Sequence, residues 1–443
     1  MVSPPRSEVG PVSSPPTQPC VRPWRVCVIT GSRSEYGLMR WVLEGLRDDP
    51  AFRVQLIATG SHFSTEHGET WREIVADGFT LDAAIPLSLG AATPATLAAA
   101  VGDLAGRLAV ELERLQPDLV MVMGDRYELL GVITACILVT VPIAHLSGGE
   151  LTEGVIDEQV RHAVTKAAHL HFVAHDLFGA RVAQMGEESW RICVCGEPGL
   201  DGIHRLTLPT PHAFAADIGF APGSPLALVT FHPVTLEREA LGDQVSALVA
   251  ALEEGARRYG LQYLLTYPNS DAGADRIIAA FQLFAAGRPD RRFTPSLGRR
   301  RYLAALRDCR MMIGNSSSGL YEAPCFNLPV INIGSRQGGR LRGTNVLDVA
   351  PDTAAIVRGM EQALGWDRTV SCTNPYGDGH AIPRMLAFLK AVLVERNRDD
   401  LLRKRFQDMD RLQVPRGVVP GPHDLMVPNA PAPNAPNAPN AKE

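Results

Sequence analysis

Acidic side chains and an arginine recur within one stretch of this sequence, residues 119–171. Asp125 and Glu150 each follow a short apolar run, and Asp157 lies four residues before Arg161. Residues four apart share one face of a helix. Clustered acids that are buried can have pKa values near neutral pH, as the removal and return of a proton require. The stretch therefore predicts a cleft in which three carboxylates and an arginine converge.

The elements around these residues explain why they would meet. The apolar runs 119–123 and 141–146 have the length and the Val and Ile content of buried strands, and 127–139 is apolar enough for a buried crossover helix. A strand–helix–strand unit places both polar clusters at the carboxyl edge of a parallel sheet, where open α/β folds bind ligands.

Each of these residues also has a simpler interpretation. Asp125 could simply be the N-cap of the next helix. Gly148-Gly149-Glu150 could be a tight turn with a solvated acid, and Asp157 could form a surface ion pair with Arg161. All three groups, however, recur within one strand–helix–strand–helix unit, each directly after a buried element. This recurrence favours the interpretation as a site.

Two loops elsewhere have the composition of anion sites. A strand over 24–30 leads into the loop 31–35, which contains Arg33, and then into a helix over 36–46. A strand over 309–313 leads into Gly314-Asn315-Ser316-Ser317-Ser318-Gly319, whose hydroxyls and backbone N–H groups suit a phosphate, although a capped turn would look similar. Glu322, one turn later, could hold a ribose diol. Neither loop is a GxGxxG fingerprint, so a nicotinamide cofactor is not implied.

Composition narrows the classes of function. The chain has 443 residues, a net charge of -5 and 45% hydrophobic residues, which indicates a soluble, globular protein with room for two domains. The absence of a basic block argues against a nucleic acid partner. The eight cysteines have no zinc-finger spacing, and no signal peptide or membrane-spanning segment is evident. We therefore expect a cytoplasmic protein with no membrane partner.

The order of apolar runs and breaker residues predicts two α/β units with disordered ends. The predicted segments are a disordered leader (1–23), an N-terminal α/β domain (24–205), a linker (206–224), a C-terminal α/β domain (225–382), a helix that packs back on the first domain (383–398), and a disordered tail rich in Pro, Asn and Ala (414–443).

Six motifs together resemble a known family. The motifs GSRSEYG, MGDRYE, HLSGGELTEGVIDEQVRHAVTKAAHLHF, TFHPVTLE, YPNSDAG and GNSSSGLYEAPCFNLPVINIGSRQGGR occur in the order seen in the hydrolysing UDP-N-acetylglucosamine 2-epimerases of sialic acid synthesis. Related hydrolases of UDP-diacetamido-trideoxyhexoses, which serve legionaminic acid synthesis, share the pattern. The resemblance covers residues 25–390 and implies an α/β fold of the GT-B type, with two Rossmann-like domains facing across a cleft.

The resemblance also implies roles for particular residues. Catalytic positions of the family correspond to Asp125, Glu150, Asp157 and His232, and UDP-binding positions to Arg33, Ser316, Ser317, Glu322 and Arg336; Arg161 and Asn269 match further positions in the cleft. Position 158 is also acidic, so Glu158 is the alternative to Asp157, which has the better register with Arg161. The loop 31–35 reads Ser-Arg-Ser-Glu where relatives often have Thr-Arg-Ala-Asp/Glu, and it keeps the arginine and the acid.

The family mechanism begins with loss of UDP from C1 and of the proton from C2, which gives a glycal, and ends with addition of water to give the free 2-epimer. It requires no metal and no cofactor; the substrate is a UDP-sugar, and we expect a homo-oligomer, either a dimer or a tetramer. Three alternatives remain: a GT-B glycosyltransferase, a non-hydrolysing UDP-N-acetylglucosamine 2-epimerase, and an inactive sensor of sugar nucleotides. The acids at 125, 150 and 157 argue against the first, and the Ile-Asp-Glu-x-x-Arg-His pattern argues against the second.

Overall fold

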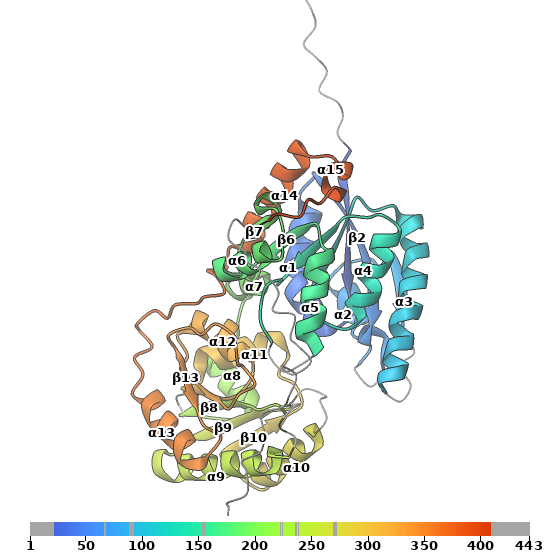
Figure 1. The fold of residues 1–443 in the computed structure, drawn as a ribbon. Helices are drawn as coiled ribbons and strands as arrows, with labels where there is room; N and C mark the ends of the chain where they lie inside the picture. Colours follow the sequence, from blue (N-terminus) through green and yellow to red (C-terminus); the bar gives the residue numbers. More distant parts are fainter. Residues whose placement is uncertain are drawn as a thin grey trace, which may run out of the picture. The chain divides into compact units, whose positions relative to one another are not determined.

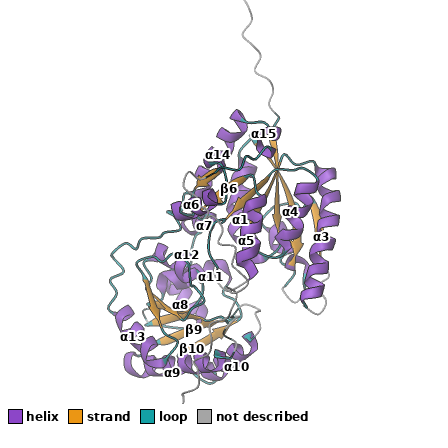
Figure 2. Ribbon diagram, in the orientation of Figure 1, coloured by secondary structure: helices purple, strands orange, loops and turns teal. Residues whose placement is uncertain are grey.

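The computed structural model describes residues 22–65, 68–87, 93–152, 156–221, 223, 225–234, 237, 239–268 and 273–408. Within these ranges, strands and helices alternate and the strands form two parallel sheets, drawn in orange in Figure 2. Residues 1–21 of the predicted leader and the whole predicted tail lie outside the described residues. Arg22 makes a two-pronged salt bridge with Asp118, at 2.7 and 2.8 Å, and so takes part in the contacts of the N-terminal domain.

The N-terminal domain is built on a sheet that, in the described part of the chain, has seven strands in the order β3-β2-β1-β4-β5-β6-β7. Its strands are β1 (Trp24–Thr30), β2 (Phe52–Gly60), β3 (Ala83–Pro86), β4 (Leu119–Met123), β5 (Ile143–Leu146), β6 (Leu170–Val173) and β7 (Ile192–Val194). Its helices are α1 (Arg33–Asp48), α2 (Trp71–Ala76), α3 (Pro94–Leu115), α4 (Glu128–Leu138), α5 (Ile156–Ala167), α6 (Asp176–Gln184) and α7 (Pro198–Arg205).

The C-terminal domain repeats this plan. Its sheet has, among the described residues, six strands in the order β10-β9-β8-β11-β12-β13. The strands are β8 (Leu226–Thr230), β9 (Gln262–Thr266), β10 (Arg291–Thr294), β11 (Met311–Gly314), β12 (Val330–Ile333) and β13 (Val346–Val349). The helices after α7 are α8 (Pro211–Ile218), α9 (Leu241–Tyr259), α10 (Ala274–Ala285), α11 (Gly298–Asp308), α12 (Ser318–Tyr321), α13 (Thr353–Leu364), α14 (Ala381–Glu395) and α15 (Arg398–Leu402).

Helices cover both faces of the N-terminal sheet. All five residues of β4 are buried, as expected for a central strand with a core on each side. One core contains residues of α1 and α14, and the other contains residues of α3, α4 and α5, which lie side by side in Figure 1. Helix α14 comes from the far end of the chain, and its Met385 and Leu389 are buried against the N-terminal domain.

The strand order reverses once in each sheet, within the described residues. In the first sheet the order reverses between β1 and β4, and in the second between β8 and β11. Open parallel sheets bind ligands just outside the carboxyl ends of the strands at such a reversal. The residues there are Arg33 and Asp125 in the first sheet, and His232 and Ser316 in the second. The topology therefore brings the sequence-predicted residues to the two expected positions.

The structure also differs from the expected elements. Helix α1 begins at Arg33 rather than at residue 36, because the Ser32 hydroxyl caps it by accepting from the Glu35 backbone N–H. Strands β3, β10 and β13 are additional to the predicted strands; they are four residues long and only partly buried, so their apolar signal is weak. The predicted linker 206–224 contains the helix α8, whose Phe214 is buried.

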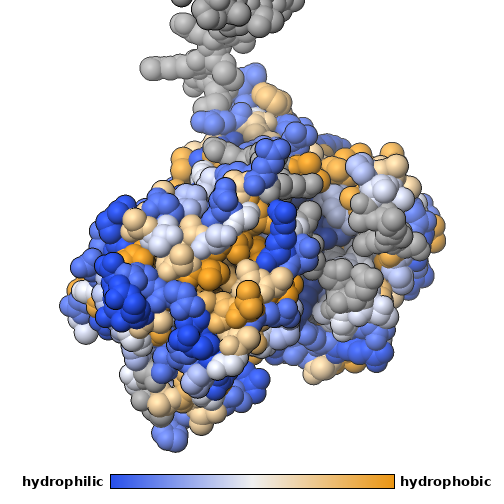
Figure 3. Space-filling model, turned by 90° about the horizontal axis from the view of Figure 1, so that it is seen from below, coloured by the Kyte–Doolittle hydropathy of each residue, from blue (hydrophilic) through white to orange (hydrophobic). Residues whose placement is uncertain are grey.

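Hydrophilic and hydrophobic residues are interspersed on the face drawn in Figure 3. Among the described residues, the three most exposed large apolar side chains lie on three different helices: Leu138 on α4, Leu283 on α10 and Val394 on α14. None of the helices in the described ranges combines the length and the apolar character needed to cross a lipid bilayer.

Candidate active site

Arg161 is the centre of the acidic cluster in the N-terminal domain. Its guanidinium forms a short salt bridge with Asp125 and lies 3.3 Å from Glu150 Oε2. It also donates to the Ser147 carbonyl oxygen at 3.0 Å and to the Thr152 hydroxyl at 2.9 Å. The side chains of Arg161 and Glu150 are each only 4% exposed, so both charges are held away from water and compensate each other. The loops after β4 and β5 and the helix α5 therefore converge as their sequence predicts.

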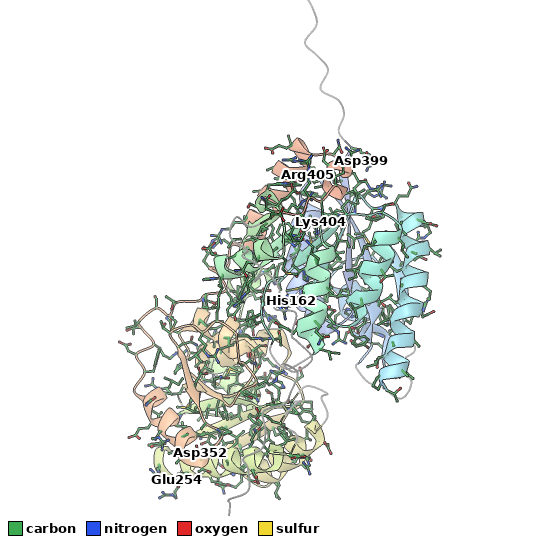
Figure 4. All side chains as sticks on the ribbon, viewed as in Figure 1. His162, Glu254, Asp352, Asp399, Lys404 and Arg405 are labelled. Atoms are coloured by element: carbon green, nitrogen blue, oxygen red, sulfur yellow. The ribbon has the colours of Figure 1, made fainter. Side chains whose placement is uncertain are left out.

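The two adjacent acids of α5 have different surroundings. Glu158 accepts from the Thr152 backbone N–H with one carboxylate oxygen and lies 3.0 Å from His162 Nε2 with the other. His162 is labelled on α5 in Figure 4. Both oxygens of Glu158 are thus engaged within its own segment. Asp157 is half-buried in the first turn of the same helix. Asp157 therefore stays the predicted acid on its register with Arg161, with Glu158 as the alternative.

His232 follows β8 and is buried. Asn315 fixes its backbone: the Asn315 side chain accepts from His232 N at 2.7 Å and donates to His232 O at 2.9 Å. Burial, together with the positive charge of Arg336, lowers the pKa of His232 to about 3. The imidazole is therefore neutral at neutral pH, and it can donate or accept a hydrogen bond without carrying a charge. Arg336 itself donates to the Asn315 carbonyl oxygen at 3.2 Å.

The loop 314–319, called the serine loop below, begins where the backbones of β11 and β8 lie close together. Gly314 has a φ of 140°, and a Cβ atom there would lie 1.9 Å from the Thr230 carbonyl oxygen, so only glycine fits this position. Ser316 and Ser317 follow at the carboxyl end of β11, half-buried. The Ser316 hydroxyl lies 3.4 Å from that of Ser318, which in turn forms a short hydrogen bond with Tyr302. These bonds fix the loop in one conformation.

The remaining predicted nucleotide ligands are distributed as follows. Glu322 forms a short salt bridge with Arg299, and its side chain is 12% exposed. Arg33 is half exposed in the first turn of α1 and forms a salt bridge with Glu73 at 3.0 Å. Asn269 lies outside the described residues. The assignments of Arg33, Glu322 and the serines of the loop 316–318 to the nucleotide stay predictions.

Two residues that sequence reasoning did not single out lie against the acidic cluster. The Tyr321 hydroxyl donates to Glu150 Oε2 at 2.7 Å. Glu197 is buried, and one of its carboxylate oxygens accepts from the Ser147 hydroxyl at 3.3 Å. Burial, and then the nearby charge of Glu150, raise the pKa of Glu197 to about 8. The sequence pattern indicates little about the role of either residue. Tyr321 lies inside the motif GNSSSGLYEAP, and Glu197 precedes Pro198 at a helix start.

A model of the UDP-N-acetylglucosamine 2-epimerase family matches residues 44–390. This range contains both sheets apart from β1 and includes Asp125, Arg161 and the serine loop. The chain therefore belongs to the UDP-N-acetylglucosamine 2-epimerase family. Within the described residues, no group of three or more His, Cys, Asp or Glu side chains is arranged to hold a metal ion.

Individual relatives agree with this membership. The chain is 37% identical to UDP-N,N'-diacetylbacillosamine 2-epimerase (hydrolyzing) of Legionella pneumophila, over 83% of this chain and 96% of the relative. It is 33% identical to GDP/UDP-N,N'-diacetylbacillosamine 2-epimerase (hydrolyzing) of Campylobacter jejuni, over 73% and 84%. The crystal structure of UDP-GlcNAc 2-epimerase from Neisseria meningitidis bound to UDP-GlcNAc superposes with a TM-score of 0.69 at 18% identity, over 83% of this chain and 100% of that one. The predicted GT-B-like fold is thereby confirmed.

Proposed function

We propose that this enzyme hydrolyses UDP-N,N'-diacetylbacillosamine to UDP and the free sugar epimerised at C2. The enzyme is a hydrolysing UDP-sugar 2-epimerase, and the relatives at 37% and 33% identity carry the diacetylbacillosamine substrate in their names. UDP-N-acetylglucosamine, which lacks the second acetamido group, is the alternative substrate. The observation that carries the proposal is the Asp125–Arg161–Glu150 cluster, which places two carboxylates and one cation at the carboxyl edge of the sheet.

The reaction needs two steps. In the first, a carboxylate removes the C2 proton, the C2–H electrons form a C1=C2 double bond, and the C1–O electrons leave with UDP. In the second, the glycal takes a proton at C2 on the opposite face, and water supplies a hydroxyl group to C1. One water molecule is consumed, and the products are UDP and the 2-epimeric sugar. Asp125, Glu150 and Asp157 are the groups we assign to the proton transfers.

The other half of the site would stabilise the leaving group. Negative charge develops on the diphosphate as the C1–O bond breaks, and cations and hydrogen-bond donors placed there lower the barrier. The loop 316–318 follows β11, and Arg336, which follows β12, donates to the neighbouring Asn315 carbonyl oxygen, so both suit this role. His232, which is neutral, would donate a hydrogen bond to the leaving oxygen rather than act as a cation.

Isotope labelling tests the bond changes. In deuterium oxide, the released 2-epimer should carry deuterium at C2, because the C2 proton is exchanged with solvent. In water enriched in ¹⁸O, the label should appear at C1 of the sugar and not in UDP. The free sugar incubated alone serves as the control for exchange at C1. Label in the UDP phosphate would mean cleavage of a phosphorus–oxygen bond, and the mechanism would have to be abandoned.

Product analysis decides between the substrates and the alternative reactions. The enzyme is incubated separately with UDP-N,N'-diacetylbacillosamine and with UDP-N-acetylglucosamine, without any acceptor, and the products are identified by NMR. We expect faster release of a free 2-epimeric sugar from the first. A product that still carries UDP would indicate a non-hydrolysing epimerase, and dependence on an added acceptor would indicate a glycosyltransferase. A higher kcat/KM with UDP-N-acetylglucosamine would reverse the substrate assignment.

Nucleotide binding gives a separate prediction. Ser317→Ala and Glu322→Ala should each weaken UDP affinity on the order of 10-fold, because each removes a polar group that we assign to the diphosphate or the ribose. Isothermal titration calorimetry with UDP measures this. Ser246→Ala is the matched control, since Ser246 is exposed on α9 and its hydroxyl donates to the Gly242 carbonyl oxygen at 2.8 Å. Wild-type UDP affinity in both variants would place the nucleotide site elsewhere.

A further inference from the structure

Tyr321 joins the serine loop to the acidic cluster. It is the last residue of α12, four residues after Ser317, and its hydroxyl donates to Glu150 Oε2 at 2.7 Å. Glu150 follows β5 in the N-terminal sheet, whereas Tyr321 follows β11 in the C-terminal sheet. This hydrogen bond therefore links a carboxylate of the proposed acid–base set directly to the short segment that carries the proposed nucleotide ligands.

The phenol of Tyr321 is held from several sides. Its ring lies 3.9 Å from the ring of Tyr376, between centroids, and the guanidinium carbon of Arg340 lies 5.9 Å from its centroid. The Tyr321 carbonyl oxygen accepts from the Asn374 side chain at 2.8 Å. Burial, together with the charge of Glu150, raises the pKa of Tyr321 well above its usual value. The hydroxyl is therefore a neutral donor in a fixed position.

The two oxygens of Glu150 have different environments as a result. Oε2 accepts from Tyr321 and lies 3.3 Å from the Arg161 guanidinium, whereas Oε1 is buried and has no hydrogen-bond partner within the described ranges. A carboxylate with one oxygen anchored by two donors presents the other oxygen in a defined direction. A proton that Glu150 takes or gives is thus directed to Oε1, because Oε2 is already occupied.

We propose that Tyr321 is a positioning residue for the reaction: its hydroxyl holds Glu150 Oε2, so that Oε1 is aimed at the reacting carbon of the sugar. This inference rests on the proposed function, in that it takes Glu150 as a group that transfers a proton. Because Tyr321 and Glu322 are adjacent, the same segment that is assigned to the ribose also sets the orientation of the acid.

Tyr321→Phe tests the inference, because it keeps the ring between Tyr376 and Arg340 and removes only the hydroxyl. We expect kcat to fall on the order of 10- to 100-fold, as for loss of a hydrogen bond to a charged group, while KM and the affinity for UDP stay within about twofold. Tyr263→Phe is the matched control. It removes a buried hydroxyl of the same domain, which donates to the Leu252 carbonyl oxygen at 2.7 Å, and it should leave kcat unchanged.

The outcomes separate this inference from the proposed function. A normal kcat in Tyr321→Phe, beside a large loss in Glu150→Gln, would overturn the positioning role and leave the proposed function intact. Equal losses of kcat and UDP affinity in Tyr321→Phe would also overturn it, since Tyr321 would then act on the nucleotide. A normal kcat in Glu150→Gln would instead remove Glu150 from the proposed mechanism, and the inference with it.

Discussion

Asp125→Asn, Glu150→Gln and Asp157→Asn should each lower kcat on the order of 10²- to 10⁴-fold, the loss typical of removing one acid–base group. Each substitution keeps the size of the side chain and removes its ability to take up a proton. UDP affinity should change little, because the assigned nucleotide ligands other than Arg33 follow strands of the C-terminal sheet. Steady-state rates with the preferred UDP-sugar, and titration calorimetry with UDP, measure the two quantities.

Two controls make this experiment specific. Asp103→Asn removes a carboxylate from the exposed face of α3 and should leave kcat unchanged. Glu158→Gln resolves the choice between the adjacent acids of α5. Because Glu158 is engaged with Thr152 and His162, we expect a smaller loss than in Asp157→Asn. A normal rate in Asp157→Asn combined with a large loss in Glu158→Gln would transfer the catalytic assignment to Glu158.

The largest effect on stability is expected for Glu187→Gln. Glu187 is buried, and it accepts hydrogen bonds from Lys166 and Lys404 at 2.8 Å and lies 3.1 Å from His171 Nε2. Lys404, labelled in Figure 4, belongs to the segment that follows α15, so the carboxylate ties the end of the described chain to the N-terminal domain. Removing one partner from a buried ionic cluster typically costs about 3–5 kcal/mol, because the remaining charges are left uncompensated.

The pH dependence of this effect follows from the pKa of Glu187. Burial opposes ionisation, but the hydrogen bonds from His171, Lys166 and Lys404 outweigh it and lower the pKa to about 2. A pKa lowered in the folded state stabilises the protein above the pKa of the unfolded chain, and this stabilisation is lost as the pH falls towards 2. The difference in unfolding free energy between the wild type and Glu187→Gln should therefore have its largest value at pH 7 and become smaller below about pH 4.5.

For Glu197→Gln, we expect the opposite dependence of stability on pH. The raised pKa of Glu197, about 8, means that the folded state prefers the neutral acid. The stability of the wild type relative to this variant should then fall by up to about 1.4 kcal/mol for each pH unit between about pH 4.5 and pH 8. Denaturant unfolding at pH 3, 5, 7 and 8.5 measures both variants. For Glu187→Gln, a difference from the wild type that is as large at pH 3 as at pH 7 would contradict the assignment. For Glu197→Gln, a difference that is the same at pH 5, 7 and 8.5 would contradict it.

The apolar runs of the sequence were sufficient to predict β1, β4, β5 and β11 and the positions that follow them. Residues 119–123 become β4 and residues 141–146 contain β5, because continuous Val, Leu, Ile and Met runs are stable only when both faces of a strand are buried. The positions of Asp125, Glu150 and Ser316 at the carboxyl edges follow from the parallel arrangement. Short, partly exposed strands such as β10, which reads Arg-Arg-Phe-Thr, have no such signal.

Tertiary structure alone decided which partners these side chains have. Spacing within α5 could not indicate that the Arg161 guanidinium contacts Asp125 and Glu150, which come from other loops. Tyr321 meets Glu150 across 171 positions of sequence, and Glu197 acquires its raised pKa from burial and from the charge of Glu150. Local sequence determines the repeat of strands and helices, because the apolar pattern within each element decides which of its faces can be buried. Contacts between distant segments depend on how the two sheets are packed, and no local pattern encodes them.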